Sequence, residues 1–395
     1  MLIALYLLAL YILTKPFYLW ESGLPQISDI ILVVAFIIAI ISVEKKLLRS
    51  IIFENKYFFI FLIFVVIINV IYSIYYIDGS FLLHGLYYVF DALGIVTFII
   101  IFKMEPRFNK TFSRTFKLSL LIQLLIFVLH LGRYYSESRY MGTFNDPNQF
   151  AYYCFLSYGF IYLLDRNKNR LFSFCFFVLT LFLIFESGST GMLAGISVFL
   201  VFYCIRAIKH IIANLRRYLF PMIIVGLLVL CGVCIMSINA NNDNFDFDLA
   251  DNQTIARVLE KISKAEGNEE MSLWQERGYD RMVFYPEYLL YGAGEGAFWR
   301  FEKAYHRQEF HATLPSILFC YGIIPTCFVL LWFFQKLKGK NMETLCILLA
   351  LLAESFTLIN SRQVLFWVIF VVVDYLPSKT QVGNNLAIIE EGDLQ

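Results

Sequence analysis

The chain has 395 residues, of which 59% are hydrophobic, and its mean hydropathy is +0.67. This composition excludes an ordinary soluble globular protein and predicts an integral membrane protein. The 32 Lys and Arg residues nearly balance the 31 Asp and Glu residues, so the net charge of +1 gives no electrostatic reason to expect nucleic-acid binding.

Apolar runs long enough to form membrane-spanning helices recur along the whole chain. The first run lacks a basic segment before it and a small-residue cleavage site after it, so we expect it to be a spanning helix and not a signal peptide. The expected fold class is an all-α polytopic membrane protein with about twelve transmembrane helices. The runs cover residues 1–13, 27–43, 57–77, 81–102, 116–131, 148–164, 171–186, 189–205, 218–238, 312–335, 342–358 and 363–376.

Basic residues mark every second connection between these runs. Cytoplasmic connections of membrane proteins are enriched in Lys and Arg, so this alternation predicts that both termini lie in the cytoplasm. The basic connections are 44–56, 103–117, 166–170, 206–217 and 336–340, and the alternate short connections hold only Lys15, Arg133, Arg139 and Arg362.

One connection, residues 239–311, is much longer than the others and is called the large loop below. It begins with a polar stretch and shows helical patterns from about Thr254 onwards. Long loops with ordered segments are usually functional. The predicted organisation is nine transmembrane helices in 1–238, the outward, partly helical large loop in 239–311, three transmembrane helices in 312–376 and a cytoplasmic tail in 377–395.

Arginines on the outward side oppose the topological bias of the basic residues. Each one alone could anchor the membrane interface or pair with a nearby glutamate. Together with His311 they predict a site that holds an anion, because the planar guanidinium matches phosphate oxygens. These arginines are Arg133, Arg139, Arg277, Arg281, Arg300 and Arg307.

The turn NDPNQF precedes the apolar run that starts at residue 148. Asn145 or Asp146 is placed to cap a helix that opens at Pro147. A helix N-terminus exposes N–H groups and is a favourable place for phosphate. Capping without any ligand is the alternative use of Asp146.

Two further turns contain groups that suit an anion. In ESGSTG, Ser187, Ser189 and Thr190 can donate to a phosphate or make local turn bonds. GAGEGAF at 292–298 does not follow a strand of a βαβ unit, so a dinucleotide site is rejected, and a backbone nest or a flexible turn remain open. No HExxH, Cys/His metal spacing or Walker loop occurs, so neither a metal nor another cofactor is predicted.

Ionisable residues also fall within the apolar runs, where charges are costly. A transporter of lipid-linked sugars would use such residues, and it is the alternative from another functional class. Charges distributed through the spans and inverted repeats would favour it, whereas here the ionisable cluster lies on one face. The residues are His84, Asp91, His130, Glu354 and Asp374.

Four segments carry a family resemblance. KPFYLWESGLPQISD stands in the first outward connection, RYMGTFNDPNQFA contains Arg-x-x-Gly followed by an Asp-Pro-Asn turn, and ESGSTGML contains Ser-Gly-Ser. In the large loop, ten residues separate Arg281 from Gly292, and His311 precedes Gly322 at the spacing His-x-x9-Gly. In this order the segments resemble the motifs of the O-antigen ligase and polymerase family of bacterial membrane glycosyltransferases.

The chain departs from that family's pattern at two positions. Ala312 replaces the usual amide or hydroxyl residue after the histidine, and Thr190 stands where an arginine often follows the Ser-Gly-Ser turn. The second departure removes one phosphate contact that the resemblance implies, and Arg139 or Arg362 could supply it instead.

The resemblance implies a glycosyltransferase that uses an undecaprenyl-pyrophosphate-linked oligosaccharide at the outer face of the inner (cytoplasmic) membrane, with inversion and without a metal. Polymerisation of repeat units for O-antigen lipopolysaccharide, capsule or exopolysaccharide is the main expectation. A ligase that transfers glycan to a lipid core is the near alternative, because both need the same donor site. The implied partners are the lipid-linked oligosaccharide, the bilayer, a chain-length regulator and a flippase.

The resemblance also implies roles for individual residues. His311 is expected to be the general base, and an interfacial cap or anchor is its alternative role. Arg281, Arg139, Arg277 and Arg133 are expected to bind the donor pyrophosphate. Turns and helix ends are expected to support the site through Asn145, Asp146, Asn148, Ser187, Ser189, Gly292 and Gly322.

Overall fold

The computed structural model describes residues 1–20, 26–136, 138–165, 170–213, 253–265 and 272–376. The predicted spanning helix at 218–238, the polar start of the large loop and the tail at 377–395 lie outside the described residues. The described part of the chain is mainly helical, and the sheet that it contains is one short antiparallel hairpin between residues 133 and 142. This agrees with the all-α class that the apolar runs predict.

Most described elements before the large loop follow the apolar runs within three residues, but the helix Phe108–Val128 begins eight residues before the run 116–131 and the helix Thr190–Ala213 ends eight residues after the run 189–205. The predicted basic connection 44–56 is not a simple loop, since it contains a helix of its own. The elements are α1 (Leu2–Thr14), α2 (Ile27–Ile41), α3 (Lys45–Glu54), α4 (Lys56–Tyr76), α5 (Ser80–Met104), α6 (Phe108–Val128), β1 (Arg133–Tyr135), β2 (Arg139–Gly142), α7 (Pro147–Leu164), α8 (Arg170–Ser187) and α9 (Thr190–Ala213).

The described part of the large loop consists of one helix and several single turns, which are followed by the C-terminal helices. These elements are α11 (Gln253–Ala265), α12 (Leu273–Glu276), α13 (Arg281–Phe284), α14 (Tyr288–Tyr291), η2 (Phe298–Arg300), η3 (Ala304–Arg307), α15 (Thr313–Tyr321), α16 (Ile323–Leu337), α17 (Met342–Glu354) and α18 (Val364–Val372).

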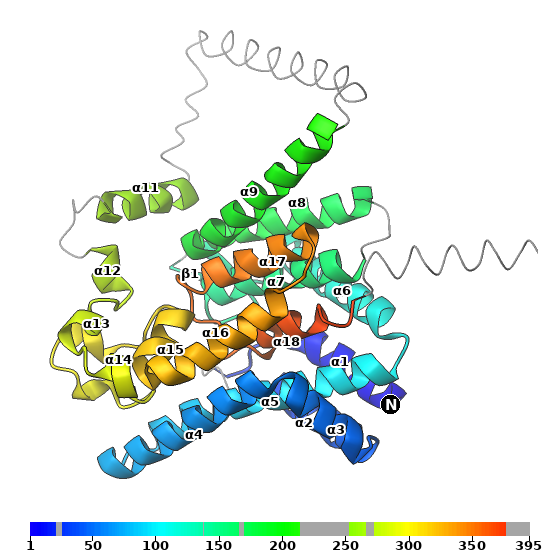
Figure 1. Cartoon of the computed structure of the whole chain (residues 1–395). Coiled ribbons are helices and arrows are strands. Elements are labelled where there is room, and N and C mark those ends of the chain that lie inside the picture. Colours follow the sequence, from blue (N-terminus) through cyan, green and yellow to red (C-terminus); the bar gives the residue numbers. More distant parts are fainter. Residues whose placement is uncertain (21–25, 137, 166–169, 214–252, 266–271, 377–395) are drawn as a thin grey trace, which may run out of the picture.

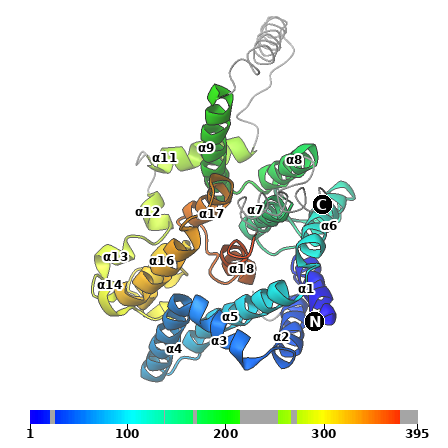
Figure 2. The ribbon, with the colours of Figure 1, turned by 45° about the vertical axis from the view of Figure 1, so that its right-hand side comes forward.

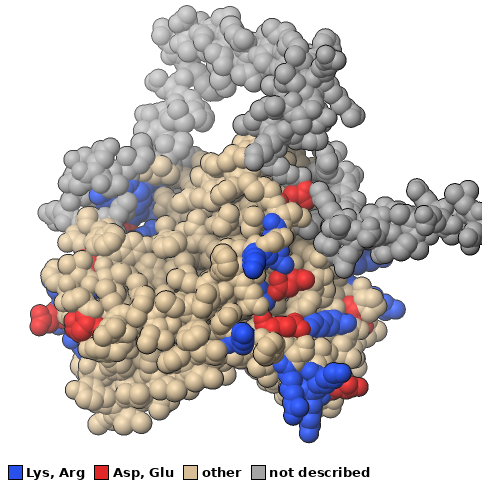
Figure 3. Space-filling view, viewed as in Figure 1, with Lys and Arg blue, Asp and Glu red and all other residues tan. Residues whose placement is uncertain are grey.

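Among the described residues, three helices are long and apolar enough to cross a membrane by length and composition: α4, α5 and α6. Shorter apolar helices occur in α1, α2, α8, α9 and α16. Most of the face in Figure 3 is uncharged, and charged side chains gather toward its left and right sides. An uncharged belt between charged ends is what a bilayer requires, so the chain is a membrane protein.

The core of the bundle forms around α18 (Figures 1 and 2). Every residue of α18 is buried, and the helix contacts α5, α7, α16 and α17. Its sequence, VLFWVIFVV, explains this place, because a helix that is apolar on all sides can be enclosed without leaving polar side chains unpaired. Around it, α9 packs on α17, α4 packs on α5 and α16, and α6 packs on α7.

The apolar run 312–335 is not one helix. It breaks at Gly322, whose φ of +80° and ψ of 177° end α15 and start α16. The backbone of Ala293 and Gly294, in the large loop, lies beside the break. The Ala293 N–H donates to the Phe319 carbonyl (2.9 Å), and the Gly294 N–H donates to the Cys320 carbonyl (2.7 Å). A helix can be interrupted inside an apolar environment only where other backbone groups satisfy its free carbonyls, and this segment of the large loop does so.

Gly292 and Gly322 make this approach sterically possible. A Cβ on Gly322 would lie 2.5 Å from the Leu290 carbonyl oxygen, and a Cβ on Gly292 would lie 2.6 Å from the Cys320 carbonyl oxygen. Both glycines also have positive φ, +83° for Gly292 and +80° for Gly322. The two glycines that we expected to support the site therefore allow two segments to pack closely: Gly322 lies against residues 290–292, and Gly292 lies against residues 320–321.

Candidate functional site

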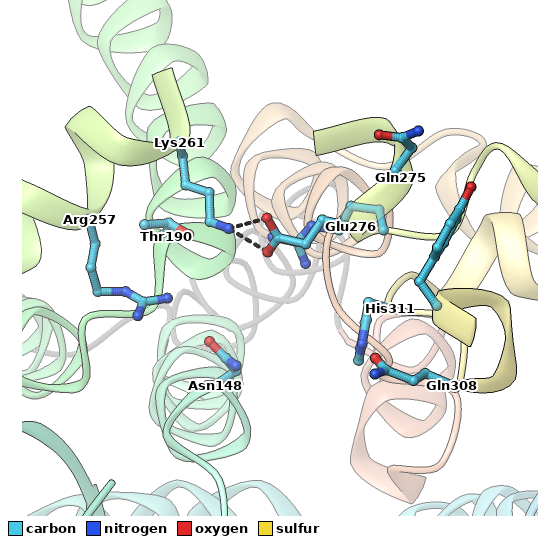
Figure 4. Close-up of a pocket in the computed structure, with 10 residues that line it drawn as sticks. Asn148, Thr190, Arg257, Lys261, Gln275, Glu276, Gln308 and His311 are labelled. Carbon is cyan, nitrogen blue, oxygen red and sulfur yellow. Dashed lines mark hydrogen bonds and ion pairs between the residues drawn. The ribbon is translucent and has the colours of Figure 1, made fainter. Parts of the chain in front are cut away.

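A polar cavity of about 290 Å³ lies where the large loop meets the helix bundle (Figure 4). Its walls come from the N-termini of α7 and α9, from α11 and α12, and from the segment that leads into α15. These elements are far apart in the sequence, so the cavity exists only in the folded chain. Its lining residues are Asn148, Thr190, Arg257, Lys261, Gln275, Glu276, Arg277, Tyr305, Gln308 and His311.

His311 lies in this cavity, two residues before α15. Partial burial by the cavity walls lowers the pKa of its imidazole below the usual 6.5, and the guanidinium of Arg277 lowers it further. The ring is therefore neutral at pH 7 and has a lone pair that can accept a proton. His311 thus has the protonation state of a general base.

The charges of the cavity are mainly positive. Lys261 forms an ion pair with Glu276, which Figure 4 marks with dashed lines. Arg277 donates to the Thr357 carbonyl, and the Nε of Arg257 is buried with no hydrogen-bond partner among the described residues. Neither arginine makes an ion pair with a carboxylate in the described part of the chain. Two guanidinium groups that make no close ion pair with a carboxylate among the described residues favour an anion as a further partner.

Arg139 lies directly behind this wall, on β2. Its Nε donates to the Ser187 carbonyl (3.0 Å), and its Nη2 donates to Oδ1 of Asn148 (3.0 Å), which lines the cavity. Arg139 and Arg257 both approach Gly188, each with an atom 3.6 Å from the place of a Cβ there. Burial and the charge of Arg257 lower the pKa of Arg139 to about 10. The structure therefore brings Arg139 to the edge of the cavity, where it orients Asn148.

The NDPNQF turn forms the cap of α7. Oδ1 of Asp146 accepts from the N–H groups of Asn148 (2.8 Å) and Gln149 (2.9 Å), which is the capping role predicted as one alternative. Asn145 accepts instead from Nη1 of Arg133 (2.8 Å). Arg133 is exposed on the strand β1 and does not line the cavity, so among these residues only Asn148 reaches it.

The turn between α8 and α9 uses its hydroxyl groups in different ways. Ser187 Oγ donates to the Ile184 carbonyl (2.6 Å), a local turn bond. Ser189 is buried, and its Oγ has no hydrogen-bond partner within the described ranges. Thr190 lines the cavity. Arg257 approaches the same turn through Gly188, so a cation from α11 is present near the position where the family resemblance leads one to expect arginine.

Arg281 does not line the cavity. It is 1% exposed, and its Nη2 donates to the Gln308 carbonyl (2.6 Å) while the guanidinium packs against the ring of Phe310. Burial lowers its pKa to about 10. Because Gln308 itself lines the cavity, Arg281 is placed to hold this wall from behind. Its predicted direct contact with pyrophosphate stays a prediction.

His306, the other histidine near the site, is fully buried. Its Nε2 lies 3.0 Å from Oδ2 of Asp280, the residue before Arg281. Burial lowers the pKa of His306. The side chain is enclosed by the rings of Phe284, Tyr285 and Tyr305, so its position is that of a packing residue of the large loop.

A second charged cluster holds the segment that carries His311. Arg362 donates from Nη1 to Glu309 (2.9 Å) and from Nη2 to Glu295 (3.1 Å), and His84 lies 3.5 Å from Glu309. Although burial opposes it, the contact with His84 and the charge of Arg362 lower the pKa of Glu309 to about 2. Glu309 is thus a very weak base, and Arg362 is engaged here and not in the cavity.

Glu295 anchors the loop segment 292–297 to the helix bundle. The hydroxyl of Tyr321 donates to its Oε2 (2.8 Å), and its backbone N–H donates to Asn69 of α4 (3.0 Å). The segment GAGEGAF therefore joins α4, α15 and the α17–α18 connection. It acts neither as a free turn nor as a wall of the cavity.

Sequence reasoning missed Arg257, Lys261 and Glu309. Arg257 and Lys261 are four residues apart on α11, so they share a helix face, and that spacing was the available signal. No local sequence pattern pointed to Glu309, because its place in the site depends on its ion pair with Arg362, which is distant in the sequence.

Within this site, the charge of Arg277 acts on a neutral imidazole, and Arg257 and the N-terminus of α7 lie across the cavity from it. Such an arrangement can bind a phosphorylated group and remove a proton from a hydroxyl next to it. The chain matches no protein-family model, and no curated protein is similar to it in sequence.

Proposed function

We propose that the chain is a membrane glycosyltransferase that polymerises undecaprenyl-pyrophosphate-linked oligosaccharide units. The observation that carries the proposal is the cavity itself: the charge of Arg277 acts on His311, and Arg257 and Asn148 lie across the cavity from His311 (Figure 4). A pyrophosphate is a good leaving group, so the reaction needs cations to hold it and a base for the acceptor hydroxyl. The cavity contains both.

The proposed topology has about twelve spans with both termini in the cytoplasm, which places the cavity at the outer face of the inner membrane. Among the described residues, three helices meet the length and composition of a span, and one of the shorter apolar helices, α16, contacts α18. Helices shorter than a bilayer is thick can still serve as spans where they are broken or enclosed by protein. The discontinuous pair α15 and α16 is such a case.

In the proposed reaction the acceptor hydroxyl oxygen attacks the anomeric carbon of the donor sugar. The bond between that carbon and the pyrophosphate oxygen breaks, and undecaprenyl pyrophosphate leaves with the bonding electrons. His311 takes the hydroxyl proton, and attack on the face opposite the leaving group inverts the configuration. Arg257 and Arg277 balance the charge that develops on the leaving pyrophosphate.

The test is to reconstitute the purified chain and to supply a single lipid-linked repeat unit. Products with several repeats support a polymerase. Transfer of the unit to an added lipid-core acceptor, without longer chains, would identify the ligase instead. Failure to make any glycosidic bond with matching repeat units and acceptors would contradict a transferase of either kind.

The decisive variants are His311→Ala and His130→Ala. A positioned base contributes roughly 10²- to 10⁴-fold in rate, so His311→Ala should make no detectable polymer. His130 is exposed after α6 and does not line the cavity, so His130→Ala controls for histidine loss and should retain activity. Polymer of normal length from His311→Ala at normal expression would show that another group is the base.

Substitution of the cavity arginines tests donor binding. A hydrogen bond to a charged group contributes roughly 1.5–3 kcal/mol, so Arg257→Ala and Arg277→Ala should each lower donor use about ten- to hundredfold. Arg133→Ala is the matched control, because Arg133 is exposed outside the cavity. Unchanged donor use in both cavity variants would contradict a pyrophosphate at this place.

A transporter of lipid-linked sugars remains the second candidate, and one observation favours it. Asp91 of α5 is fully buried, and neither of its carboxylate oxygens has a hydrogen-bond partner in the described structure. Buried acidic residues of this kind occur in proton pathways of transporters. The two functions differ in one measurement: movement of the intact lipid-linked unit across liposomes, without new glycosidic bonds, would support transport.

A further inference from the structure

We propose that one face of the large loop is immersed in the bilayer and binds the acyl chains of membrane lipids. This face, called the loop face below, consists of α13, α14 and η2. Four of its apolar side chains are between 53% and 70% exposed: Val283, Leu290, Tyr291 and Trp299. The ring of Phe284 on the same face is instead covered by the ammonium of Lys303, 3.2 Å from its centre. The inference concerns what covers these residues and does not depend on the proposed enzymatic activity.

The depth of the loop face follows from its contacts with α4. The Glu295 N–H donates to Asn69 (3.0 Å), and the hydroxyl of Tyr72 donates to the Gly292 carbonyl (2.8 Å). Asn69 lies seven residues before Tyr76, the C-terminal residue of α4, and seven residues correspond to about 10 Å of helix. The chain after Tyr291 therefore runs alongside a membrane-spanning helix, below its end.

The loop face is continuous with a surface that already faces lipid. On α4, Ile71, Ile74 and Tyr75 are 57%, 73% and 75% exposed, and α4 is a spanning helix by length and composition. On the other side, Gly322 places the Leu290 backbone against the start of α16, where Ile323 and Ile324 are exposed. In both ribbon views α13 and α14 lie near α4 and α16 (Figures 1 and 2).

Trp299 marks the edge of the immersed region. Its indole N–H donates to Oδ2 of Asp78 (3.0 Å), just beyond the end of α4, and its ring packs edge-on against Tyr76. Tryptophan with an apolar ring and a satisfied N–H is typical of the membrane–water interface. Arg300 also lies here, 5.1 Å from the ring centre of Tyr76, so its charge is stabilised by aromatic rings at this level.

A lipid occupant explains these observations together. A cluster of exposed apolar side chains of this kind is uncommon on a soluble surface, but the adjoining residues belong to α4, which has the length and composition of a membrane span. Interfacial segments bury their apolar face about 5–10 Å into the headgroup and acyl boundary, which agrees with the depth set by Asn69 and Tyr72. The loop face would thus hold the large loop, whose residues also line the cavity, at the membrane surface.

The test uses fluorescence of the full chain in liposomes that contain brominated phospholipids, which quench tryptophan only on contact with the acyl chains. The chain has five tryptophans, so each contribution is obtained by difference. Trp299→Phe should remove a component of the tryptophan fluorescence that is quenched by brominated lipid but is not quenched by iodide dissolved in the water. Trp274→Phe is the matched control, because Trp274 is also about half exposed, at 52%, but lies on α12 beside the charged cavity. This variant should remove an iodide-sensitive component.

A gain-of-signal variant keeps the proposal testable if Trp299→Phe changes the fold. Adding Leu290→Trp to Trp299→Phe should restore a lipid-quenched component, since Leu290 is 68% exposed on the same face. Iodide quenching of Trp299 or of the new tryptophan would show that water covers the face. Protection from both quenchers would show that protein covers it, for example a second copy. Either result would overturn the proposal.

Discussion

The break between α15 and α16 gives a stability prediction that does not depend on any function. In Gly322→Ala, the new methyl group would lie 2.5 Å from the Leu290 carbonyl oxygen and 2.9 Å from the Gly292 nitrogen. Both are backbone atoms, so no side-chain rotation can relieve the contact. The loop segment must move away from the break, or the break must close.

The expected cost has two parts. The backbone at Gly322 has φ of +80° and ψ of 177°, a region that costs an alanine about 1–3 kcal/mol. Movement of the segment also weakens the bonds from Ala293 and Gly294 to the carbonyls of α15, each with a net contribution of about 0.5–1.5 kcal/mol. Together these give about 2–6 kcal/mol, a large fraction of the stability of a typical domain.

Two other glycines separate these contributions. Gly339 has a positive φ of +73° but no atom within 4 Å of a new Cβ, and Gly79 has neither a positive φ nor a neighbour within that distance. Gly339→Ala should therefore cost about 1–2 kcal/mol from the backbone alone. Gly79→Ala should be neutral or slightly stabilising.

The assay is thermal unfolding of the purified variants in the same detergent. The midpoint temperature should be highest for the wild type and Gly79→Ala, lower for Gly339→Ala and lowest for Gly322→Ala. A midpoint for Gly322→Ala equal to that of Gly339→Ala would show that the close approach of Leu290 contributes nothing. The steric explanation of the break would then be wrong.

Two further predictions concern the site. Burial lowers the pKa of His311 most, Arg277 and Arg281 lower it further, and Glu309 and Glu276 raise it. Because a base acts only when neutral, activity should rise with pH through that pKa. Glu309→Gln removes a charge that raises the pKa of His311, so it should move the acidic limb of the kcat/KM pH profile to lower pH. Arg277→Ala removes a charge that lowers this pKa, so it should move the limb to higher pH. Shifts in the same direction would contradict the role of His311 as base. Arg281→Lys should lower thermal stability together with activity, because the buried guanidinium of Arg281 donates a hydrogen bond to the Gln308 carbonyl. Loss of activity at unchanged stability would instead indicate that Arg281 contacts the donor directly.

Much of the local structure was predictable from the sequence. Apolar runs identify helices because a helix in a membrane must satisfy its own backbone, so the composition of one segment is sufficient. The start of α7 was predictable for a similar reason, since an Asp before Pro forms a cap from adjacent residues alone. A glycine at position 322 indicated that something approaches closely, although its identity as Leu290 could not be read from the chain.

The composition of the site was decided by the tertiary structure. Arg281 and Arg257 are both arginines of the large loop. The spacing of Arg257 and Lys261 shows only that these two share a helix face, and the sequence does not show that Arg281 is buried while Arg257 lines the cavity. The same holds for His306 and His311, five residues apart, of which one is enclosed by aromatic rings and the other faces the cavity. The sequence by itself therefore determined that the chain is a helical membrane protein and which residue types its site could contain. Only the packing of segments distant in the chain decided which of those residues meet, because contact between them depends on the fold and not on their spacing.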